Sequence, residues 1–300
     1  MTARETKLGL ALAVLAYGAW GVIPIYWKLL GGVAPGEILA HRVAGSVTLG
    51  ILLVCATGRA KSTLAILRAP ASRRAMFAST ALIAMNWGMF IWAVTTSHLT
   101  QASLGYFMNP LCNALLGRVV LGETLTRAQV ISFGFAGAGV LWLILSGDGF
   151  PWLALALAGS FSLYGLVRKR AEAGALEGFT IETAIAAPIA LVFLATREPA
   201  FGTIATGATR TRLLLLGSGM VTAVPLIAFA AAAKRLRYTT LGMVQFLAPS
   251  LQLFCAVVLF GEPFPTRLAL AFALIGLGAL VYAVDALNRS MHRTRKHGSE

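Results

Sequence analysis

Long apolar runs alternate with short polar connections along almost the whole chain. A helix needs about 20 residues to cross roughly 30 Å of hydrocarbon, and runs of this length predict ten membrane-spanning helices. Their approximate bounds are 8–30, 35–57, 74–97, 101–121, 127–146, 150–169, 179–196, 212–233, 238–260 and 267–287. The connections between them are too short for a separate soluble domain. We therefore expect an all-α integral membrane protein.

The fourth and ninth of these runs repeat one sequence pattern. Residues 103–125 and 240–264 share a Leu-Gly pair near the start, an internal proline and a Gly-Glu pair near the end. Repeats of this size in apolar segments are typical of duplicated membrane proteins. Because each half contains an odd number of spans, the second half has to enter the membrane from the opposite side. The pattern predicts inverted five-helix repeats at 1–147 and 148–288, followed by a basic cytoplasmic tail at 289–300.

Lysine and arginine are concentrated on one side of this topology. Nineteen of the 25 basic residues fall in the termini and connections that share a side with the N-terminus, and five fall in connections on the other side. Cytoplasmic loops carry the excess of basic residues. Both termini are therefore predicted to be cytoplasmic, in a multi-pass protein of a bacterial inner membrane.

Composition excludes several other classes of protein. Hydrophobic residues make up 58% of the chain and charged residues 12%, which is far from the composition of a soluble domain. No basic stripe interleaved with aromatic residues accompanies the net charge of +14, so the lipid bilayer is the expected partner and a nucleic acid is not. The three cysteines lie in apolar runs without ligand-like spacing, and no nucleotide-binding motif is present. We therefore expect no disulfide, metal or cofactor.

Two of the repeated spans carry polar stripes. Tyr106, Asn109 and Asn113 follow one another at helical spacing, and Gln245 and Gln252 lie on the equivalent face of the later span. Amides that face lipid would lack hydrogen-bond partners, so both stripes have to face protein or a cavity. Two interpretations stay open: the stripes line a binding cavity, or they hold helices together.

Aromatic residues and prolines accompany these stripes. Residues that suit an amphipathic organic ligand lie in other spans, namely Tyr17, Trp20, Asn86, Trp87 and Tyr164. Trp27, nearer a span end, is expected in an interfacial aromatic belt. Prolines remove a backbone hydrogen bond and predict helix kinks at Pro24, Pro110 and Pro249. The kink at Pro24 would free the carbonyl of Trp20.

A few ionisable groups fall inside the predicted spans, where such groups are functional candidates. Glu37, His41 and Arg42 begin the second span, and Glu182 lies at a comparable point in the seventh. One interpretation is gating or proton relay by these four residues. The other is an ion-paired cluster at the outer interface, with Glu37 favouring the helix N-terminus.

Small residues and loop glutamates predict packing rather than chemistry. Spans 127–146 and 267–287 carry glycine faces that favour close helix contact, either within the chain or between two copies in a homodimer. These glycines are Gly134, Gly137, Gly139, Gly276 and Gly278. Glu123 and Glu262 each follow a glycine at a loop entry, and both are expected to cap a helix or order the loop.

Several segments resemble the EamA family of the drug/metabolite transporter superfamily. They include residues 37–42, 86–94, 103–111, 164–169 and 181–183, and they run over nearly the whole chain. The resemblance implies ten spans in two inverted repeats, a central cavity walled by spans one to four and six to nine, and spans five and ten as an outer scaffold. It also implies an inner-membrane permease that exports small metabolites or drugs.

These observations lead to one main hypothesis and two alternatives. The main hypothesis is a secondary transporter that moves a small amphipathic metabolite, such as an amino acid or a related compound, or a drug, by alternating access without ATP. The first alternative is an integral-membrane enzyme that acts on a lipid-linked substrate with His41 and Glu37 as an acid–base pair. The second alternative is a passive channel.

Overall fold

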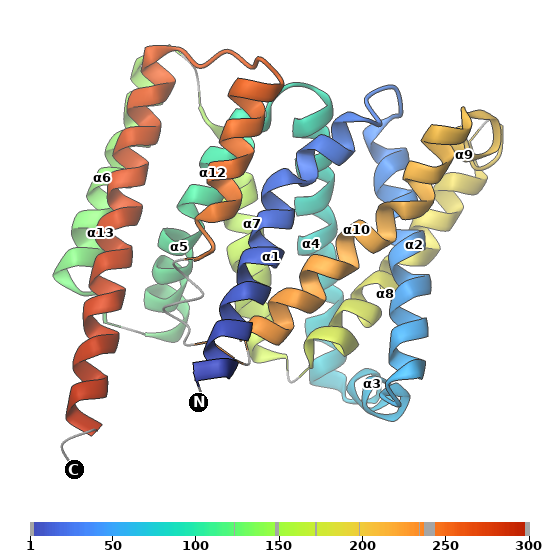
Figure 1. The fold of residues 1–300 in the computed structure, drawn as a ribbon, viewed down its shortest axis with the longest axis horizontal. Coiled ribbons are helices and arrows are strands. Elements are labelled where there is room, and N and C mark those ends of the chain that lie inside the picture. Colours follow the sequence, from blue (N-terminus) through green and yellow to red (C-terminus); the bar gives the residue numbers. More distant parts are fainter. Residues whose placement is uncertain are drawn as a thin grey trace.

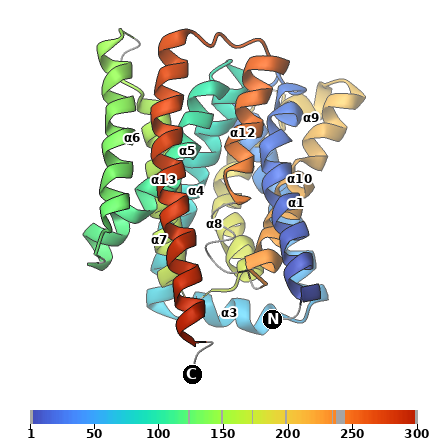
Figure 2. The same cartoon turned by 60° about the vertical axis from the view of Figure 1, so that its left-hand side comes forward.

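The computed structural model describes residues 3–122, 124–147, 150–171, 173–197, 199–233, 235–236 and 244–297. Within these residues the chain forms helices and no strand (Figure 1). The long helices run side by side as one bundle, seen from two directions in Figures 1 and 2. Their bounds are α1 Ala3–Lys28, α2 Pro35–Ala56, α4 Pro70–Thr95, α5 Leu99–Leu121, α6 Arg127–Leu145, α7 Trp152–Arg170, α8 Ala175–Ala195, α10 Thr209–Ala233 and α13 Thr266–His297.

Shorter helices lie at the ends of the bundle or break its regularity. They are α3 Ala60–Arg68, α9 Thr203–Thr206 and α12 Leu247–Phe254, which continues as a π-helical turn at Cys255–Leu259. The end of the bundle that carries α3 also carries both chain termini, and α9 lies at the opposite end (Figure 1). The sequence pattern predicts neither α3 nor α9, because both lie in connections too short or too polar to appear as spans.

Some predicted boundaries differ from the observed ones. α8 begins at Ala175, earlier than the predicted start at 179, so one more turn joins the helix. α13 extends to His297, well into the segment predicted as a basic tail. The first part of the predicted span 238–260 lies largely outside the described residues, and α12 begins at Leu247.

Seven helices of the described residues are long and apolar enough to cross a membrane. These are α1, α2, α4, α6, α8, α10 and α13. α7 and the continuous segment from α12 through the π-helical turn are apolar but shorter, and α5, which carries the polar stripe, is not among the seven. The chain is therefore an all-helical, multi-pass membrane protein, and the count of ten spans stays a prediction.

Helices of the first half pack mainly on helices of the second half. α6 packs along α13, and α2 packs along α8. α5 contacts α7 as α1 contacts α12, and α4 contacts α7 as α1 contacts α10. In the predicted numbering of spans, the equivalent helices of the two halves are α1 and α7, α2 and α8, α4 and α10, α5 and α12, and α6 and α13. When every helix is replaced by its equivalent, the α5–α7 contact becomes α12–α1 and the α4–α7 contact becomes α10–α1, whereas the α6–α13 and α2–α8 contacts stay the same.

The repeated Gly-Glu pairs share a backbone conformation. Gly122 ends α5 with a φ of +68°, and Gly261 follows the π-helical turn after α12 with a φ of +67°. Both values lie in the left-handed region, which glycine adopts without steric cost. The duplication seen in the sequence therefore extends to the local structure of these two helix ends.

Glycines also allow helices to approach each other backbone to backbone. A Cβ atom added at Gly219 of α10 would lie 2.3 Å from the carbonyl carbon of Gly45 in α2. One added at Gly105 of α5 would lie 2.5 Å from the carbonyl oxygen of Ala154 in α7. Side chains at these positions would force the helices apart, so glycine sets the spacing of both contacts.

The glycine faces of α6 and α13 are used partly within the chain. A Cβ atom at Gly139 would lie 2.8 Å from Ile275 Cγ1, and one at Gly278 would lie 2.7 Å from the Ser132 carbonyl oxygen, so both glycines serve the α6–α13 contact. The remaining positions face open space, namely Gly134, Gly137 and Gly276. Contact between two copies of the chain at these faces stays a prediction.

Candidate functional site

Arg42 lies in a buried polar site formed by four helices. Its side chain comes from α2 and is 5% exposed. Nε donates a hydrogen bond to Thr222 Oγ1 of α10 at 2.8 Å. The guanidinium lies 4.0 Å from the ring centre of Trp87 in α4 and 5.3 Å from that of Trp27 in α1. The site therefore joins three helices of the first half of the chain to one of the second half.

The positive charge of Arg42 is only partly compensated. Removing a guanidinium from water costs several kcal/mol. A desolvated cation–π contact contributes about 2 kcal/mol, and a hydrogen bond from a charged donor contributes about 1.5–3 kcal/mol. Within the described part of the chain no carboxylate pairs with Arg42, and Nη1 and Nη2 make no hydrogen bond. The site therefore carries positive charge and unused donors.

The aromatic residues predicted in the first span separate into two groups. Tyr17 and Trp20 meet edge to face, with ring centres 5.4 Å apart, and both contact Phe229 of α10. Trp27 is fully buried beside Arg42. The prediction that Trp27 belongs to an interfacial belt is therefore wrong: its ring lies in the protein interior, where it covers a buried cation.

Asn86 ties three helices together. Its Nδ2 donates to the Leu157 carbonyl at 3.1 Å and to Ser160 Oγ at 3.0 Å, both in α7. Its Oδ1 accepts a hydrogen bond from the Tyr106 hydroxyl of α5 at 3.2 Å. The residue is 1% exposed. In this conformation the contacts favour the helix-joining interpretation for Asn86 and Tyr106.

Asn86→Ala is expected to lower the free energy of unfolding by about 2 kcal/mol, because buried groups on α5 and α7 lose their partner. Reversible unfolding in mixed detergent micelles measures this change. Asn113→Ala removes an exposed amide of α5 and serves as the control, with little change expected. Wild-type stability in Asn86→Ala, combined with loss of ligand binding, would support direct ligand contact instead.

The three prolines predicted to kink helices have different positions. Pro24 and Pro110 lie inside α1 and α5, where proline leaves a carbonyl without its helical partner. The carbonyl that Pro24 frees, that of Trp20, accepts a hydrogen bond from Gln252 Nε2 of α12 at 3.1 Å. Pro249 lies instead in the first turn of α12, where a missing N–H costs no helical hydrogen bond.

The amides of the two polar stripes differ in their surroundings. Asn109 Oδ1 and Gln252 Oε1 are buried and have no hydrogen-bond partner among the described residues. Such atoms are rare in folded proteins and indicate places where water or a ligand binds. Asn113 is exposed, and Gln245 is half-buried in the turn before α12. Each stripe is therefore buried only in part.

Glu37 and His41 face a loop rather than the Arg42 site. Glu37 accepts a hydrogen bond from the backbone N–H of Thr203 at the start of α9, and His41 Nε2 lies 3.8 Å from Glu37 Oε1. Gly202 takes a φ of +58°, and a Cβ atom there would lie 2.6 Å from the Glu37 carboxylate. Glu37 and His41 therefore hold the connection after α8 against α2, an arrangement that we term the α9 latch.

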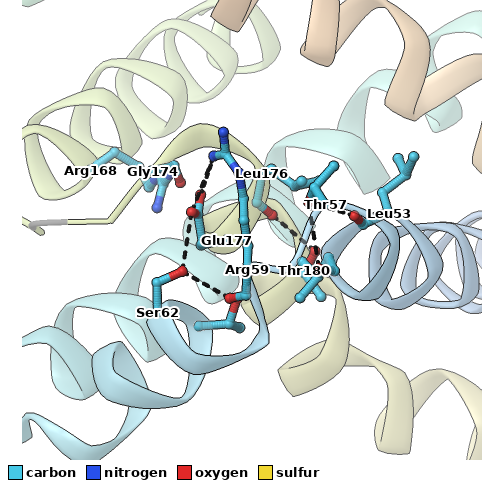
Figure 3. Close-up of polar contacts among 11 residues, drawn as sticks. Leu53, Thr57, Arg59, Ser62, Arg168, Gly174, Leu176, Glu177 and Thr180 are labelled. Carbon is cyan, nitrogen blue, oxygen red and sulfur yellow. Dashed lines mark hydrogen bonds and ion pairs between the residues drawn. The ribbon is translucent and has the colours of Figure 1, made fainter.

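Glu177 makes a corresponding contact with Arg59 (Figure 3), next to α3 and therefore at the end of the bundle opposite α9 (Figure 1). Its Oε1 lies 3.2 Å from Arg59 Nη1 and accepts a hydrogen bond from Ser62 Oγ at 3.4 Å. These residues hold the connection after α2 against α8, and we term them the α3 latch. Glu177 is absent from the residues predicted to have a role, because the predicted helix begins two residues later. Its position could have revealed its role, because Glu37 and Glu177 are each the third residue of equivalent helices.

Glu182 forms a buried network with Arg168 and Tyr164. Arg168 Nε is 3.4 Å from Glu182 Oε1, and the Tyr164 hydroxyl donates to Oε2 at 3.3 Å. Arg168 also reaches Met76 Sδ of α4 at 3.6 Å. Glu182 is 4% exposed. Tyr164 and Glu182, which the sequence places in different spans, therefore meet through one network that links α4, α7 and α8.

Glu262 caps α5 from the far end of the sequence. Its Oε1 accepts a hydrogen bond from the Leu99 N–H at 2.8 Å. Its Oε2 accepts hydrogen bonds from the Thr100 N–H at 2.7 Å and from Thr100 Oγ1 at 2.6 Å. A carboxylate at a helix N-terminus satisfies free N–H groups and complements the helix dipole. The predicted capping role is confirmed for Glu262, whereas Glu123 lies outside the described residues.

Comparison with known proteins places these features in a family. Residues 7–145 match the EamA-like transporter family. Protein RarD of Escherichia coli K12 is 38% identical over 297 residues, which cover 99% of this chain and 100% of that protein. An uncharacterized transporter of Vibrio cholerae is 37% identical over 295 residues, which cover 98% of this chain and 97% of that protein.

A solved crystal structure shares the fold. Its chain superimposes with a TM-score of 0.60 at 22% identity, covering 96% of this chain and 99% of that one. At this level of identity the likeness concerns the fold alone. Full-length relatives at 37–38% identity carry more weight: this chain belongs to the EamA-like transporter family, among its RarD-type proteins.

Proposed function

We propose that this protein is a secondary transporter that exports a small amphipathic metabolite or drug across the bacterial inner membrane by alternating access. The observation that carries the proposal is the matched pair of latches at opposite ends of the bundle, built on Glu37 and Glu177. The buried polar site around Arg42 lies in the bundle interior. Alternating access requires closures that open one at a time around one central site. Family membership and relatives named as transporters support the same function.

The contacts between helices support an inverted repeat of residues 1–147 and 148–288. Exchanging the halves maps the α5–α7 contact onto α12–α1 and the α4–α7 contact onto α10–α1. The same exchange maps the α9 latch onto the α3 latch. Glu37 of α2 holds the connection that follows α8, and Glu177 of α8 holds the connection that follows α2. Ten spans, with both basic termini in the cytoplasm, account for these equivalences.

The contacts of Glu37 and His41 favour a closure over an acid–base pair of a membrane enzyme. The Glu37 carboxylate already accepts a backbone hydrogen bond from Thr203. His41 Nε2 lies 3.8 Å from that carboxylate, and both side chains are buried under the connection after α8. A general acid or base must instead reach the group with which it exchanges a proton.

Glu37→Gln and Glu177→Gln are expected to open opposite ends of the bundle. Each change weakens one latch by about 1–2 kcal/mol, which shifts a two-state population roughly 5- to 30-fold. A cysteine placed at Asn109, with the native cysteines replaced, would report the change. Its labelling by a membrane-impermeant thiol reagent should rise from the α9 end in Glu37→Gln and from the α3 end in Glu177→Gln.

The control for the latch experiment is Glu5→Gln. Glu5 forms a partly exposed ion pair with Arg235, and such pairs contribute little, so labelling should not change. If both latch variants raise labelling from the same side, or neither raises it, the alternating-access proposal is wrong.

Transport itself is tested with purified protein in proteoliposomes. We expect saturable uptake of at least one compound from a panel of amino acids, related metabolites and drugs in the absence of ATP. Repeating the assay with and without a pH gradient tests proton coupling. Flux that rises without saturation would indicate a channel, and turnover of a lipid-linked substrate would indicate an enzyme.

A further inference from the structure

Arg42 is the only buried lysine or arginine among the residues whose burial the structure describes. It also differs from every buried carboxylate described. Each of those carboxylates has a polar partner. The partners are the Thr203 N–H for Glu37, Arg59 for Glu177, Arg168 for Glu182 and the N-terminus of α5 for Glu262. The guanidinium has aromatic neighbours and a hydroxyl partner instead, and no described anion faces it.

The contacts of Arg42 leave its terminal nitrogens available. Nε is occupied by Thr222 Oγ1, which fixes the orientation of the planar group. Nη1 and Nη2 make no hydrogen bond within the described residues, and neither is among the fully enclosed atoms that lack a partner. Paired nitrogens of a guanidinium match the two oxygens of a carboxylate. The indole rings of Trp27 and Trp87 provide apolar surface beside this donor pair.

We propose that Arg42 binds the carboxylate of the transported molecule, and that the rest of this molecule is apolar or aromatic. The inference rests on the proposed transport function and specifies its substrate class. A carboxylate fits better than a phosphate dianion because the site offers a single positive charge. The neighbouring indoles suit an apolar or aromatic remainder, since burial beside them removes apolar surface from water.

Binding at Arg42 engages both halves of the proposed repeat. Arg42 lies on α2, and its partner Thr222 lies on α10. Ser46, one turn beyond Arg42, is fully buried at the close approach of α2 and α10, and its hydroxyl has no partner among the described residues. A carboxylate that drew donors from both helices would change the α2–α10 contact. Substrate could thereby favour one state of the transporter over the other.

Carboxylic acids and their primary amides test this inference on the purified full-length protein in detergent. The acids are 3-phenylpropanoate, hexanoate and N-acetyl-L-phenylalanine, and thermal stabilisation as a function of ligand concentration gives the apparent Kd. Each acid should bind at least about tenfold more tightly than its amide. Arg42→Gln should remove this difference, and Arg42→Lys should keep part of it. Arg68→Gln, at an exposed arginine of α3, is the matched control and should keep all of it.

Three outcomes would overturn the inference. Equal binding of acids and amides by the wild type would remove the carboxylate assignment, and this comparison does not depend on whether a variant folds. A preference for acids that persists in folded Arg42→Gln would remove the role of Arg42. Saturable uptake of uncharged or cationic compounds alone would leave the transport function standing and refute the anion site.

Discussion

Gly219→Ala is expected to lower the free energy of unfolding by about 3 kcal/mol, because it overpacks the contact between α10 and α2. The added Cβ atom would lie 2.3 Å from the Gly45 carbonyl carbon and 2.7 Å from the Ser46 nitrogen. Both neighbours are backbone atoms, so no side-chain rotation relieves the clash and the helices have to separate. The Arg42–Thr222 hydrogen bond crosses this contact and should weaken with it.

Gly276→Ala in α13 is the control for this experiment. No atom lies within 4 Å of a Cβ added there, and alanine favours a helix over glycine. Gly276→Ala should therefore leave the free energy of unfolding unchanged or raise it by up to about 1 kcal/mol. Reversible unfolding in mixed micelles compares the two variants. If Gly219→Ala were as stable as the control Gly276→Ala, the described approach of α2 and α10 would be wrong.

Glu262→Ala is expected to lower the free energy of unfolding by about 3 kcal/mol, because three hydrogen-bond donors at the start of α5 lose a charged acceptor. The carboxylate is 6% exposed, so water replaces it poorly. The same unfolding measurement applies. Hydrogen exchange should in addition show faster opening of the first turn of α5, since that turn depends on the cap.

Two further variants separate capping from a general effect of burial. Glu262→Gln keeps one carbonyl oxygen as an acceptor and should lose about half as much stability. Glu5→Gln alters a partly exposed ion pair with Arg235 and should lose little. The capping interpretation fails if Glu262→Ala matches Glu5→Gln, or if Glu262→Gln is as unstable as Glu262→Ala.

Much of the fold class could be predicted from the sequence because a bilayer imposes strong rules on a chain. Every backbone polar group in hydrocarbon must be paired within the chain, so long apolar runs become helices, as in α2 and α10. Boundaries were less predictable where polar residues begin a helix. Glu177 interrupts the apolar run, and the predicted start at 179 left it outside α8, although it is the third residue of that helix.

The candidate site was predictable by residue type and only partly by role. Helical spacing places Glu37, His41 and Arg42 on adjoining turns, but successive residues point about 100° apart around a helix. Glu37 and His41 therefore meet the connection after α8, and Arg42 meets α4 and α10. Asn86 could be recognised as buried and polar, yet its partners in α7 were not visible.

The sequence by itself determined the apolar runs, the duplication, the asymmetry of basic charge and, through these, the class of protein. It also indicated that Pro24 frees a carbonyl and that Glu262 is suited to cap a helix. Only the tertiary structure decided the partners: Gln252 for the Trp20 carbonyl, and α5 for Glu262. The physical reason is that a hydrogen bond acts over about 3 Å, whereas these partners lie 232 and 163 positions apart along the chain. Packing of the helices alone brings them together.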